Sequence, residues 1–354
     1  MTIHGARLGL LRLALIGAAS FGLAVPGANA QSCFSCWPRK VVCPTDPNCT
    51  TPADATRPTT PGAPDAVPTP SPVTTAALGG ALESFSPGYM DNPVPYTHFR
   101  LRFDAAYDDN RPDRAEFFYP QCASSHSVPI LDKRIDYQDI RAYLEYAPND
   151  WLSGFVEVPY RFLNPELNAN VSGLADMNAG FKAALLRCDK SILTFQGRIY
   201  IPTGDSSVGL GNNHVSLEPG LLYANSLTEK LVFFAQLEDW IPIGGTDFEG
   251  NIINYGLGVS YTVLDNGRFR VSPVLEFLGW TVLGGKEFTF PTAAIVSAAG
   301  DTIVNGKFGV RFGFGSDWNN NLLKNSDLYI GYGRALTGDV WYKDIIRVEY
   351  ELRF

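Results

Sequence analysis

The sequence is poor in charge and methionine, and it lacks long apolar runs beyond its first residues. Charged residues are 18% of the 354 positions, and Met occurs 3 times. After residue 30 no run reaches the roughly eighteen apolar residues of a spanning helix, which excludes helical membrane spans there. The 28 Lys and Arg are outnumbered by 36 Asp and Glu, so the net charge of −8 excludes a basic surface for nucleic acid. Glycine (34), Phe (22) and Tyr (16) are abundant, which favours β-structure with many turns.

Residues 1–30 carry the features of a secretory signal. Arg7 and Arg12 supply a positive start, residues 13–24 are apolar, and Ala28 and Ala30 are the small residues that signal peptidase requires. The apolar stretch is too short for a membrane anchor. We therefore expect residues 1–30 to be a signal peptide that is removed on export.

From residue 96 to the end, apolar and polar residues alternate. In the last segment Ile346, Val348 and Tyr350 alternate with Arg347 and Glu349. This period of two is that of β-strands, and it recurs in segments of roughly ten residues. The pattern predicts about twelve strands, namely 97–107, 136–147, 151–162, 173–186, 191–202, 213–224, 231–241, 252–263, 269–280, 306–316, 327–335 and 342–354.

The connections between these strands alternate in length. Odd connections, such as 108–135 and 281–305, are mostly long, whereas even ones, such as 148–150 and 187–190, are mostly short. Long loops at one end and short turns at the other are typical of outer-membrane barrels. We therefore predict an all-β fold, an antiparallel transmembrane β-barrel of about twelve strands over residues 96–354 in the bacterial outer membrane. A secreted β-sandwich, which also alternates, is the alternative.

Five tryptophans fall near the ends of the predicted strands. Trp240, Trp280 and Trp341 lie at one end, and Trp151 and Trp318 lie at the other. Aromatic residues gather at both membrane surfaces of outer-membrane barrels. The sequence therefore predicts that these tryptophans form two girdles on the outside of the barrel.

Four of the six cysteines are clustered in residues 31–50, which we call the Cys-rich head. They are Cys33, Cys36, Cys43 and Cys49. Their spacing is compatible with a zinc site, but an exported chain folds in an oxidising compartment, which favours two disulfides whose pairing stays open. Cys122 falls in a long loop and Cys188 in a short turn, on opposite sides of the membrane. We do not expect these two to pair with each other.

Proline dominates residues 51–95, which follow the head. No aromatic residue occurs between Trp37 and Phe85. Such a segment cannot form a core, and its composition predicts an extended polyproline or disordered spacer. At ~3.1 Å per residue, residues 51–72 would reach roughly 70 Å.

If the apolar set faces lipid, the charged set faces the lumen. The residues predicted to line the lumen are Arg141, Glu145, Glu157, Arg161, Lys182, Arg198, Glu218, Glu238, Glu276, Arg311, Arg347 and Glu349. Both signs are nearly balanced, so no strong ion preference is expected. Two interpretations stay open, because such charges either pair across strands and close the barrel or line a conducting pore. Inward glycines, such as Gly256 and Gly309, either leave open space at the wall or permit the strands to bend for closure.

Two parts of the chain resemble known outer-membrane proteins. The last strand, with Tyr350, Leu352 and Phe354, resembles the C-terminal assembly signal of bacterial outer-membrane proteins. The segments Gly173–Lys182 (GLADMNAGFK) and Ile201–Gly204 (IPTG) resemble the family of outer-membrane transporters assigned to the meta pathway of phenol degradation. The likeness covers residues 140–354. It implies an uptake channel without naming the solute.

These observations predict an outer-membrane channel for small organic molecules, aromatic or hydrophobic ones among them. Its expected partners are outer-membrane lipids, the barrel-assembly machinery and the solute. A closed structural barrel that anchors its periplasmic extension is the main alternative. An outer-membrane lipid hydrolase is a weaker one, because His214 and Ser216 share a strand face but point away from the apolar face. We expect no enzyme, no cofactor and no metal.

Overall fold

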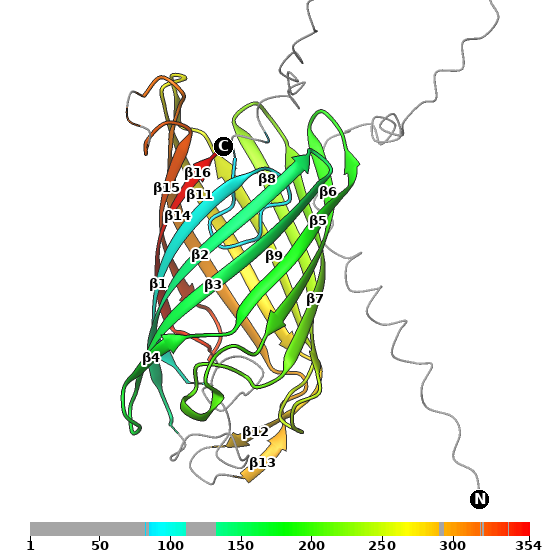
Figure 1. Cartoon of the computed structure of the whole chain (residues 1–354), viewed down its shortest axis with the longest axis vertical. Coiled ribbons are helices and arrows are strands. Elements are labelled where there is room, and N and C mark those ends of the chain that lie inside the picture. The colour runs from blue at the N-terminus through cyan, green and yellow to red at the C-terminus, as the bar shows by residue number, and fades with distance from the viewer. Residues whose placement is uncertain are drawn as a thin grey trace, which may run out of the picture. The chain divides into compact units, whose positions relative to one another are not determined.

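The computed structural model describes residues 82, 85–110, 132–289, 294–318, 320, 322–338 and 340–354. These residues form a closed antiparallel barrel with twelve wall strands (Figure 1), as predicted. The predicted signal peptide, the Cys-rich head with its four cysteines, Cys122 and residues 51–81 of the spacer lie outside the described residues. Within the described part, no helix has the length and hydropathy needed to cross a bilayer.

The wall strands follow the chain order around the barrel. They are β1 (His98–Asp109), β2 (Ile135–Asn149), β3 (Leu152–Pro165), β5 (Met177–Arg187), β6 (Ser191–Ile201), β7 (Val215–Ser226), β8 (Leu231–Ile243), β9 (Ile252–Tyr261), β11 (Phe269–Val282), β14 (Thr302–Phe314), β15 (Ser326–Ala335) and β16 (Asp344–Arg353). Each wall strand pairs with the next, and β16 pairs with β1 to close the ring. The short strands β4 (Val171–Leu174) and β10 (Leu264–Asp265) pair with β3 and β11. Strands β12 (Lys286–Thr289) and β13 (Ala294–Ser297) form a separate hairpin.

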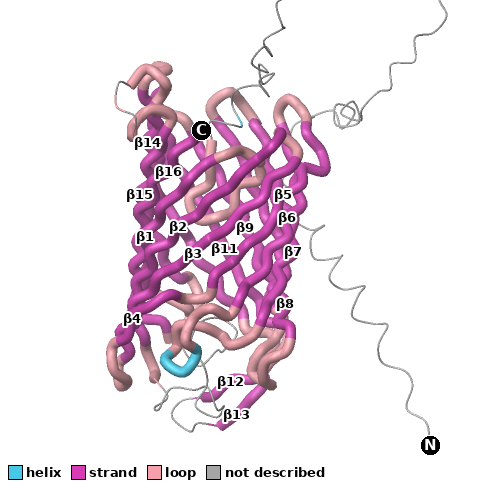
Figure 2. The backbone as a smooth tube through the Cα atoms, in the orientation of Figure 1, coloured by secondary structure: helices cyan, strands magenta, loops and turns pink. Residues whose placement is uncertain are grey.

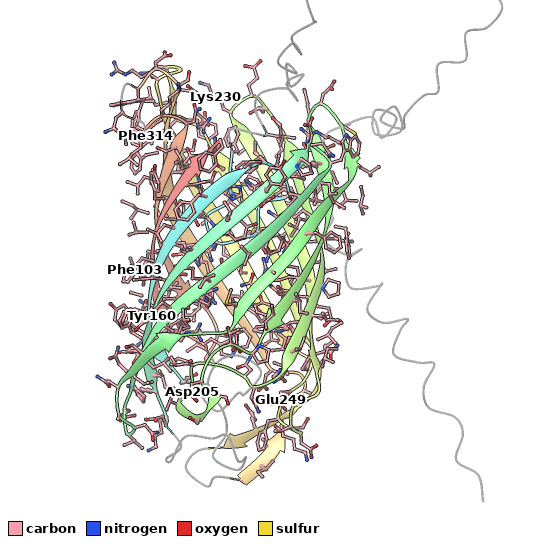
Figure 3. All side chains as sticks on the ribbon, in the orientation of Figure 1. Phe103, Tyr160, Asp205, Lys230, Glu249 and Phe314 are labelled. Atoms are coloured by element: carbon pink, nitrogen blue, oxygen red, sulfur yellow. The ribbon has the colours of Figure 1, made fainter. Side chains whose placement is uncertain are left out.

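The alternating sequence separates the two faces of the wall. On β3, Val156 and Tyr160 are exposed, whereas Glu157 and Arg161 are buried. Phe103 and Tyr160 project outward from the barrel in Figure 3. An apolar outer face with polar residues inside suits lipid, and ring closure satisfies the backbone of every wall strand without an edge. The soluble sandwich is therefore wrong.

The two ends of the barrel differ in their connections, and we call them the turn end and the loop end. The turn end holds the short β2–β3 and β5–β6 connections and the C-terminus (Figure 2). Its turn at Asp265 is locked by a 2.9 Å hydrogen bond from the Gly267 N–H to the Asp265 carboxylate, with Gly267 at φ +77°. The loop end holds the long connections and the β12–β13 hairpin.

One predicted strand is divided in the structure. The segment predicted as 173–186 forms β4 and β5, with Ala175 and Asp176 between them. The Ala175 N–H still donates to the Pro159 carbonyl at 3.1 Å, so the break stays in register with β3. Asp176 leaves the ladder because its carboxylate binds a loop, as described below.

The girdle prediction is wrong for three tryptophans. Trp341 is buried and its ring contacts that of Trp280 at 5.2 Å between centroids, while Trp240 stacks on Tyr200 at 4.7 Å. Trp240 follows buried Glu238 by two positions, so the strand period turns it inward. These aromatic residues therefore face the interior at the loop end, not the lipid.

Residues 85–97, which we call the inner loop, fold into the barrel from the turn end just before β1 (Figure 1). Residues 85–90 and 92–95 are all buried. The assignment of residues 85–95 to the spacer is therefore wrong. They dock because Phe85, Tyr89, Met90 and Val94 are buried in the interior and because backbone groups of the loop find hydrogen-bond partners on the wall.

Candidate functional site

The twelve residues predicted to line the lumen lie on the inner face of the wall. Glu145, Glu157, Arg161, Lys182, Glu218, Glu238, Glu276, Arg311, Arg347 and Glu349 are buried, and the side chains of Arg141 and Arg198 are 27% and 13% exposed. A buried charge is costly unless an opposite charge or hydrogen bonds compensate it. The groups that these side chains contact therefore decide how the charge of the interior is compensated.

Most of these charges form ion pairs between strands. Arg347 on β16 holds Asp104 on β1 through two hydrogen bonds of 2.7 and 2.8 Å. Arg161 on β3 likewise holds Asp139 on β2 through two hydrogen bonds of 2.7 and 2.8 Å. Such two-point pairs fix the side chains as well as neutralising them.

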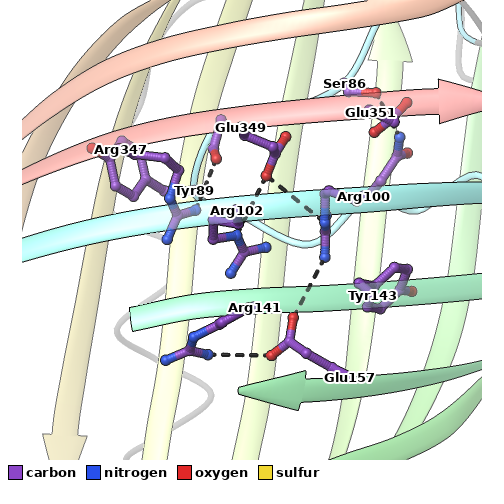
Figure 4. Close-up of polar contacts among 12 residues, drawn as sticks. Ser86, Tyr89, Arg100, Arg102, Arg141, Tyr143, Glu157, Arg347, Glu349 and Glu351 are labelled. Atoms are coloured by element: carbon purple, nitrogen blue, oxygen red, sulfur yellow. Dashed lines mark hydrogen bonds and ion pairs between the residues drawn. The ribbon is translucent and has the colours of Figure 1, made fainter. Parts of the chain in front are cut away.

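Other pairs skip a strand and reach further into the interior. The Lys182 ammonium on β5 contacts Glu145 on β2 at 2.8 Å. Figure 4 shows Arg100 on β1 between Glu349 on β16, at 3.8 Å, and Glu157 on β3, at 3.9 Å. These long side chains occupy lumen space that a wider barrel would leave to water.

The wall of β6 to β9 carries carboxylates with fewer cations. The Arg198 guanidinium contacts Glu218 at 2.6 Å. Glu238 instead accepts hydrogen bonds from three neutral amides, those of Gln196 at 3.0 Å, Gln236 at 3.3 Å and Asn254 at 2.8 Å.

The inner loop is bound mainly through its backbone. The Glu276 carboxylate on β11 accepts from the N–H groups of Gly88 at 3.0 Å, Tyr89 at 2.8 Å and Met90 at 3.2 Å. The Arg311 guanidinium donates to the carbonyl of Pro87 at 2.6 Å. A carboxylate that accepts several N–H groups can replace the water these groups would otherwise bind.

Contacts of the inner loop reach opposite sides of the ring. Arg311 and Arg347, on β14 and β16, bind the carbonyls of Pro87 and Gly88. Arg198, on β6, forms an ion pair with Asp91. Because β6 and β14 are five positions apart on a ring of twelve strands, the loop crosses the lumen.

Inward glycines make room for this loop rather than for a pore. A Cβ on Gly309 or Gly331 would lie 2.3 or 2.6 Å from the hydroxyl of Tyr329, and a Cβ on Gly88 would meet the same ring at 2.2 Å. At Gly256 the nearest atoms include the Met90 side chain at 3.3 Å. The expectation of open space at these wall glycines is therefore wrong, because Tyr329 and Met90 fill it.

Asp91 ties the loop to the wall as an ion. Burial alone would raise its pKa, but Arg198 and then Lys182 outweigh this effect and hold the pKa of Asp91 well below its usual range. The carboxylate is therefore ionised across the whole physiological range, and its contact with Arg198 is a charge pair there.

Between the inner loop and the loop end lies a cavity of about 230 Å³. Its wall combines the ion pairs with six aromatic side chains: Tyr89, Tyr137, Tyr200, Trp240, Trp280 and Tyr342. Aromatic rings bring large contact area with little rotamer entropy, and few well-placed polar groups then orient a ligand. The cavity therefore offers both charged and aromatic side chains to whatever occupies it.

The two segments behind the family resemblance meet in space. The Asp176 carboxylate accepts hydrogen bonds from the N–H groups of Gly204 at 2.9 Å and Asn212 at 2.8 Å. The Thr203 hydroxyl accepts from the Met177 N–H and donates to the Ala175 carbonyl, both at 2.9 Å. Asp176 therefore folds residues 202–214, which include the short helix η4 (Ser206–Val208), over the cavity, where Leu210 and Gly211 line it.

Several sequence candidates lie away from the cavity. His214 and Ser216 are buried at the loop end of the wall, so neither faces lipid as a lipid-cleaving pair would. Phe354 is exposed at the turn end, and its N–H donates to the Thr97 carbonyl at 3.1 Å. Cys188, in the β5–β6 turn, is disulfide-bonded. Within the described residues no group of His, Cys, Asp or Glu could hold a metal.

Several solved outer-membrane proteins are similar to this chain. An outer-membrane channel from Pseudomonas putida F1 superposes with a TM-score of 0.48 and 16% identity, covering 76% of this chain and 100% of that one. The NanC porin has a TM-score of 0.43 and 9% identity over 73% and 100% of the two chains. The KdgM porin has a TM-score of 0.38 and 9% identity over 73% and 99%. No family model and no curated protein matches the chain.

The fold itself defines the class of protein. A closed ring of tilted antiparallel strands, apolar outside and charged inside, with short turns at one end and long loops at the other, is an outer-membrane β-barrel. The protein is accordingly a barrel of the bacterial outer membrane, and its solute has to be argued from its own interior.

Proposed function

We propose that this barrel is an outer-membrane channel for small organic molecules, with a solute site in the aromatic cavity and an inner loop that closes the turn end. The observation that carries the proposal is the cavity itself, because a barrel of purely structural function has no need of an aromatic chamber below its mouth. The resemblance of Gly173–Lys182 and Ile201–Gly204 to the phenol-pathway transporters supports an uptake channel, without naming its solute.

The polar contacts support a loop that can be displaced. The inner loop is held by hydrogen bonds and ion pairs, which water can replace when the loop moves, and it also buries Phe85, Tyr89, Met90 and Val94.

The closed structural barrel stays the second candidate, because the same loop crosses the lumen and leads directly to the spacer. Solute flux into liposomes separates the two functions. We expect phenol to enter liposomes that contain the protein faster than protein-free liposomes. Replacing Trp240 and Trp280 together by Ala removes the aromatic wall and should change this rate, whereas Trp151→Ala on the outer face should not. Equal uptake with and without protein would favour the structural function.

A further inference from the structure

The interior has a surplus of positive charge at one place on its wall. Among the described residues, four arginines on β1, β2 and β14 contact two glutamates: Arg100, Arg102, Arg141 and Arg311 form ion pairs with Glu157 and Glu349. The other described carboxylate in ion-pair contact with them is Asp139, at Arg141, and Arg161 already holds Asp139 through two hydrogen bonds. Four positive charges against two negative ones leave a surplus of two. Proton uptake by a buried carboxylate relieves a surplus of negative charge, but a guanidinium does not lose its proton, so a surplus of positive charge needs an anion to compensate it.

The register of the strands shows where the missing negative charge belongs. One row across β16, β1, β2 and β3 reads Arg347, Asp104, Asp139 and Arg161, with two charges of each sign. The adjacent inward row reads Glu349, Arg102, Arg141 and Pro159. Its β3 position holds proline where the first row holds a charged residue, so the row itself has one carboxylate for two arginines. Glu349 contacts Arg102, and Arg141 bonds Asp139 at 2.7 Å and Glu157 at 3.2 Å, which belong to the neighbouring rows.

Arg102 and Arg141 are direct cross-strand neighbours on the same face. Like charges in this position repel each other unless an anion lies between them. The Arg102 side chain is 12% exposed and its one ion-pair contact among the described residues is Nε to Glu349 at 3.4 Å. Both arginines line the cavity, so an anion in the cavity can reach them.

No carboxylate across the cavity can supply this charge. Asp91 and Glu218 are both engaged by Arg198 on β6. Glu238 is held by the three amides described above. The opposite wall instead presents Trp240 and Trp280, which suit the apolar part of a ligand.

We propose that the cavity binds a small organic acid, with its carboxylate between Arg102 and Arg141 and its apolar or aromatic part against the tryptophans. This deepens the proposed function and rests on it for the step of transport, but the binding itself is independent of conduction. A planar carboxylate matches the two guanidinium groups, each of which can donate two hydrogen bonds. Neutral analogues of the same shape leave the surplus charge uncompensated.

The test is binding of benzoate to the full-length purified protein in detergent, measured by calorimetry and by quenching of tryptophan fluorescence. Benzoate should bind more tightly than benzamide, which has the same shape without the charge, and more tightly than acetate, which lacks the ring. Arg102→Gln should weaken benzoate binding by about tenfold or more, since it removes a charged hydrogen-bond donor. Arg270→Gln, which removes an equal charge near the turn end and outside the cavity, should leave binding unchanged.

A second variant keeps the test independent of the loss of an arginine. Pro159→Glu places a carboxylate at the uncharged β3 position of the row, beside Arg141. This variant keeps all four arginines and should abolish benzoate binding. Pro159→Gln is its control and should bind as the wild type does. Equal affinity for benzoate and benzamide, or benzoate binding unaffected by Pro159→Glu, would overturn the proposal. Charge-dependent binding without any solute flux would support this binding site and contradict the proposed channel function.

Discussion

The backbone N–H of Tyr89 donates a 2.8 Å hydrogen bond to the carboxylate of Glu276, 187 positions further along the chain. Gly88 and Met90 donate to the same carboxylate. One wall residue thus holds three consecutive peptide groups of the inner loop, and the segment before β1 is part of the barrel interior.

Glu276→Gln should loosen the inner loop without unfolding the wall. The amide keeps one acceptor oxygen but loses the charge, and each hydrogen bond to a charged group contributes about 1.5–3 kcal/mol. Hydrogen exchange should therefore speed up by about tenfold or more at Gly88, Tyr89 and Met90, while the β-strand amides keep their protection. Glu145→Gln, which changes a buried wall carboxylate bound to Lys182, serves as the control. Unchanged exchange at the three amides would mean that other contacts hold the loop.

Mild acid should not release the loop through Asp91. Its pKa is held below that of an unfolded Asp, so the contact stabilises the docked loop above about pH 4 and is lost only as the pH falls through the folded-state pKa. Conductance of the wild type should therefore be the same at pH 7 and pH 5. Asp91→Asn should conduct more at both values. A wild type that behaves at pH 5 as the Asn variant does at pH 7 would contradict this.

Substitutions on the two faces of β7 should affect different properties, namely folding stability on the outer face and ion selectivity on the inner face. Leu217 and Leu221 are 40% and 42% exposed on the outer face, whereas Glu218 between them is buried. Leu217→Arg or Leu221→Arg should reduce stability by ~2–4 kcal/mol at mid-bilayer. Glu218→Gln should fold normally and weaken any cation preference. Folding yield in lipid and the reversal potential measure these two effects, and the reverse result would mean that the two faces are exchanged.

Asp176→Ala should free the loop 202–214. Two backbone hydrogen bonds to its carboxylate are lost, so Gly204 and Asn212 should become more accessible to exchange, and a protease should cut this loop faster. Asp205→Ala is the matched control, because Asp205 caps the short helix at Ser207 within the same exposed loop. Faster cleavage in the Asp205 variant alone would show that the cap, not Asp176, holds the loop.

Much of the barrel is readable from the sequence, because period-two alternation decides both the strands and their inward faces. Glu218 and Leu217 are separated by this rule alone. The inner loop has no such period, and its prolines imitate the spacer before it. The outward prediction for Trp240 is wrong because its place near the strand end does not decide its side, whereas its parity with buried Glu238 does. The surplus at Arg102 depends on register between strands, which composition cannot supply.

The central claim is that the barrel is a channel that the inner loop closes. The most direct measurement is single-channel conductance in planar bilayers of the wild type and of Gly88→Val, in which the new side chain meets the Tyr329 ring and pushes the loop from its site. Gly338→Val, in an open loop position, is the control. We predict a larger or more frequent conductance for Gly88→Val than for the wild type and the control. If all three proteins fold and none conducts, the barrel is a closed structural one.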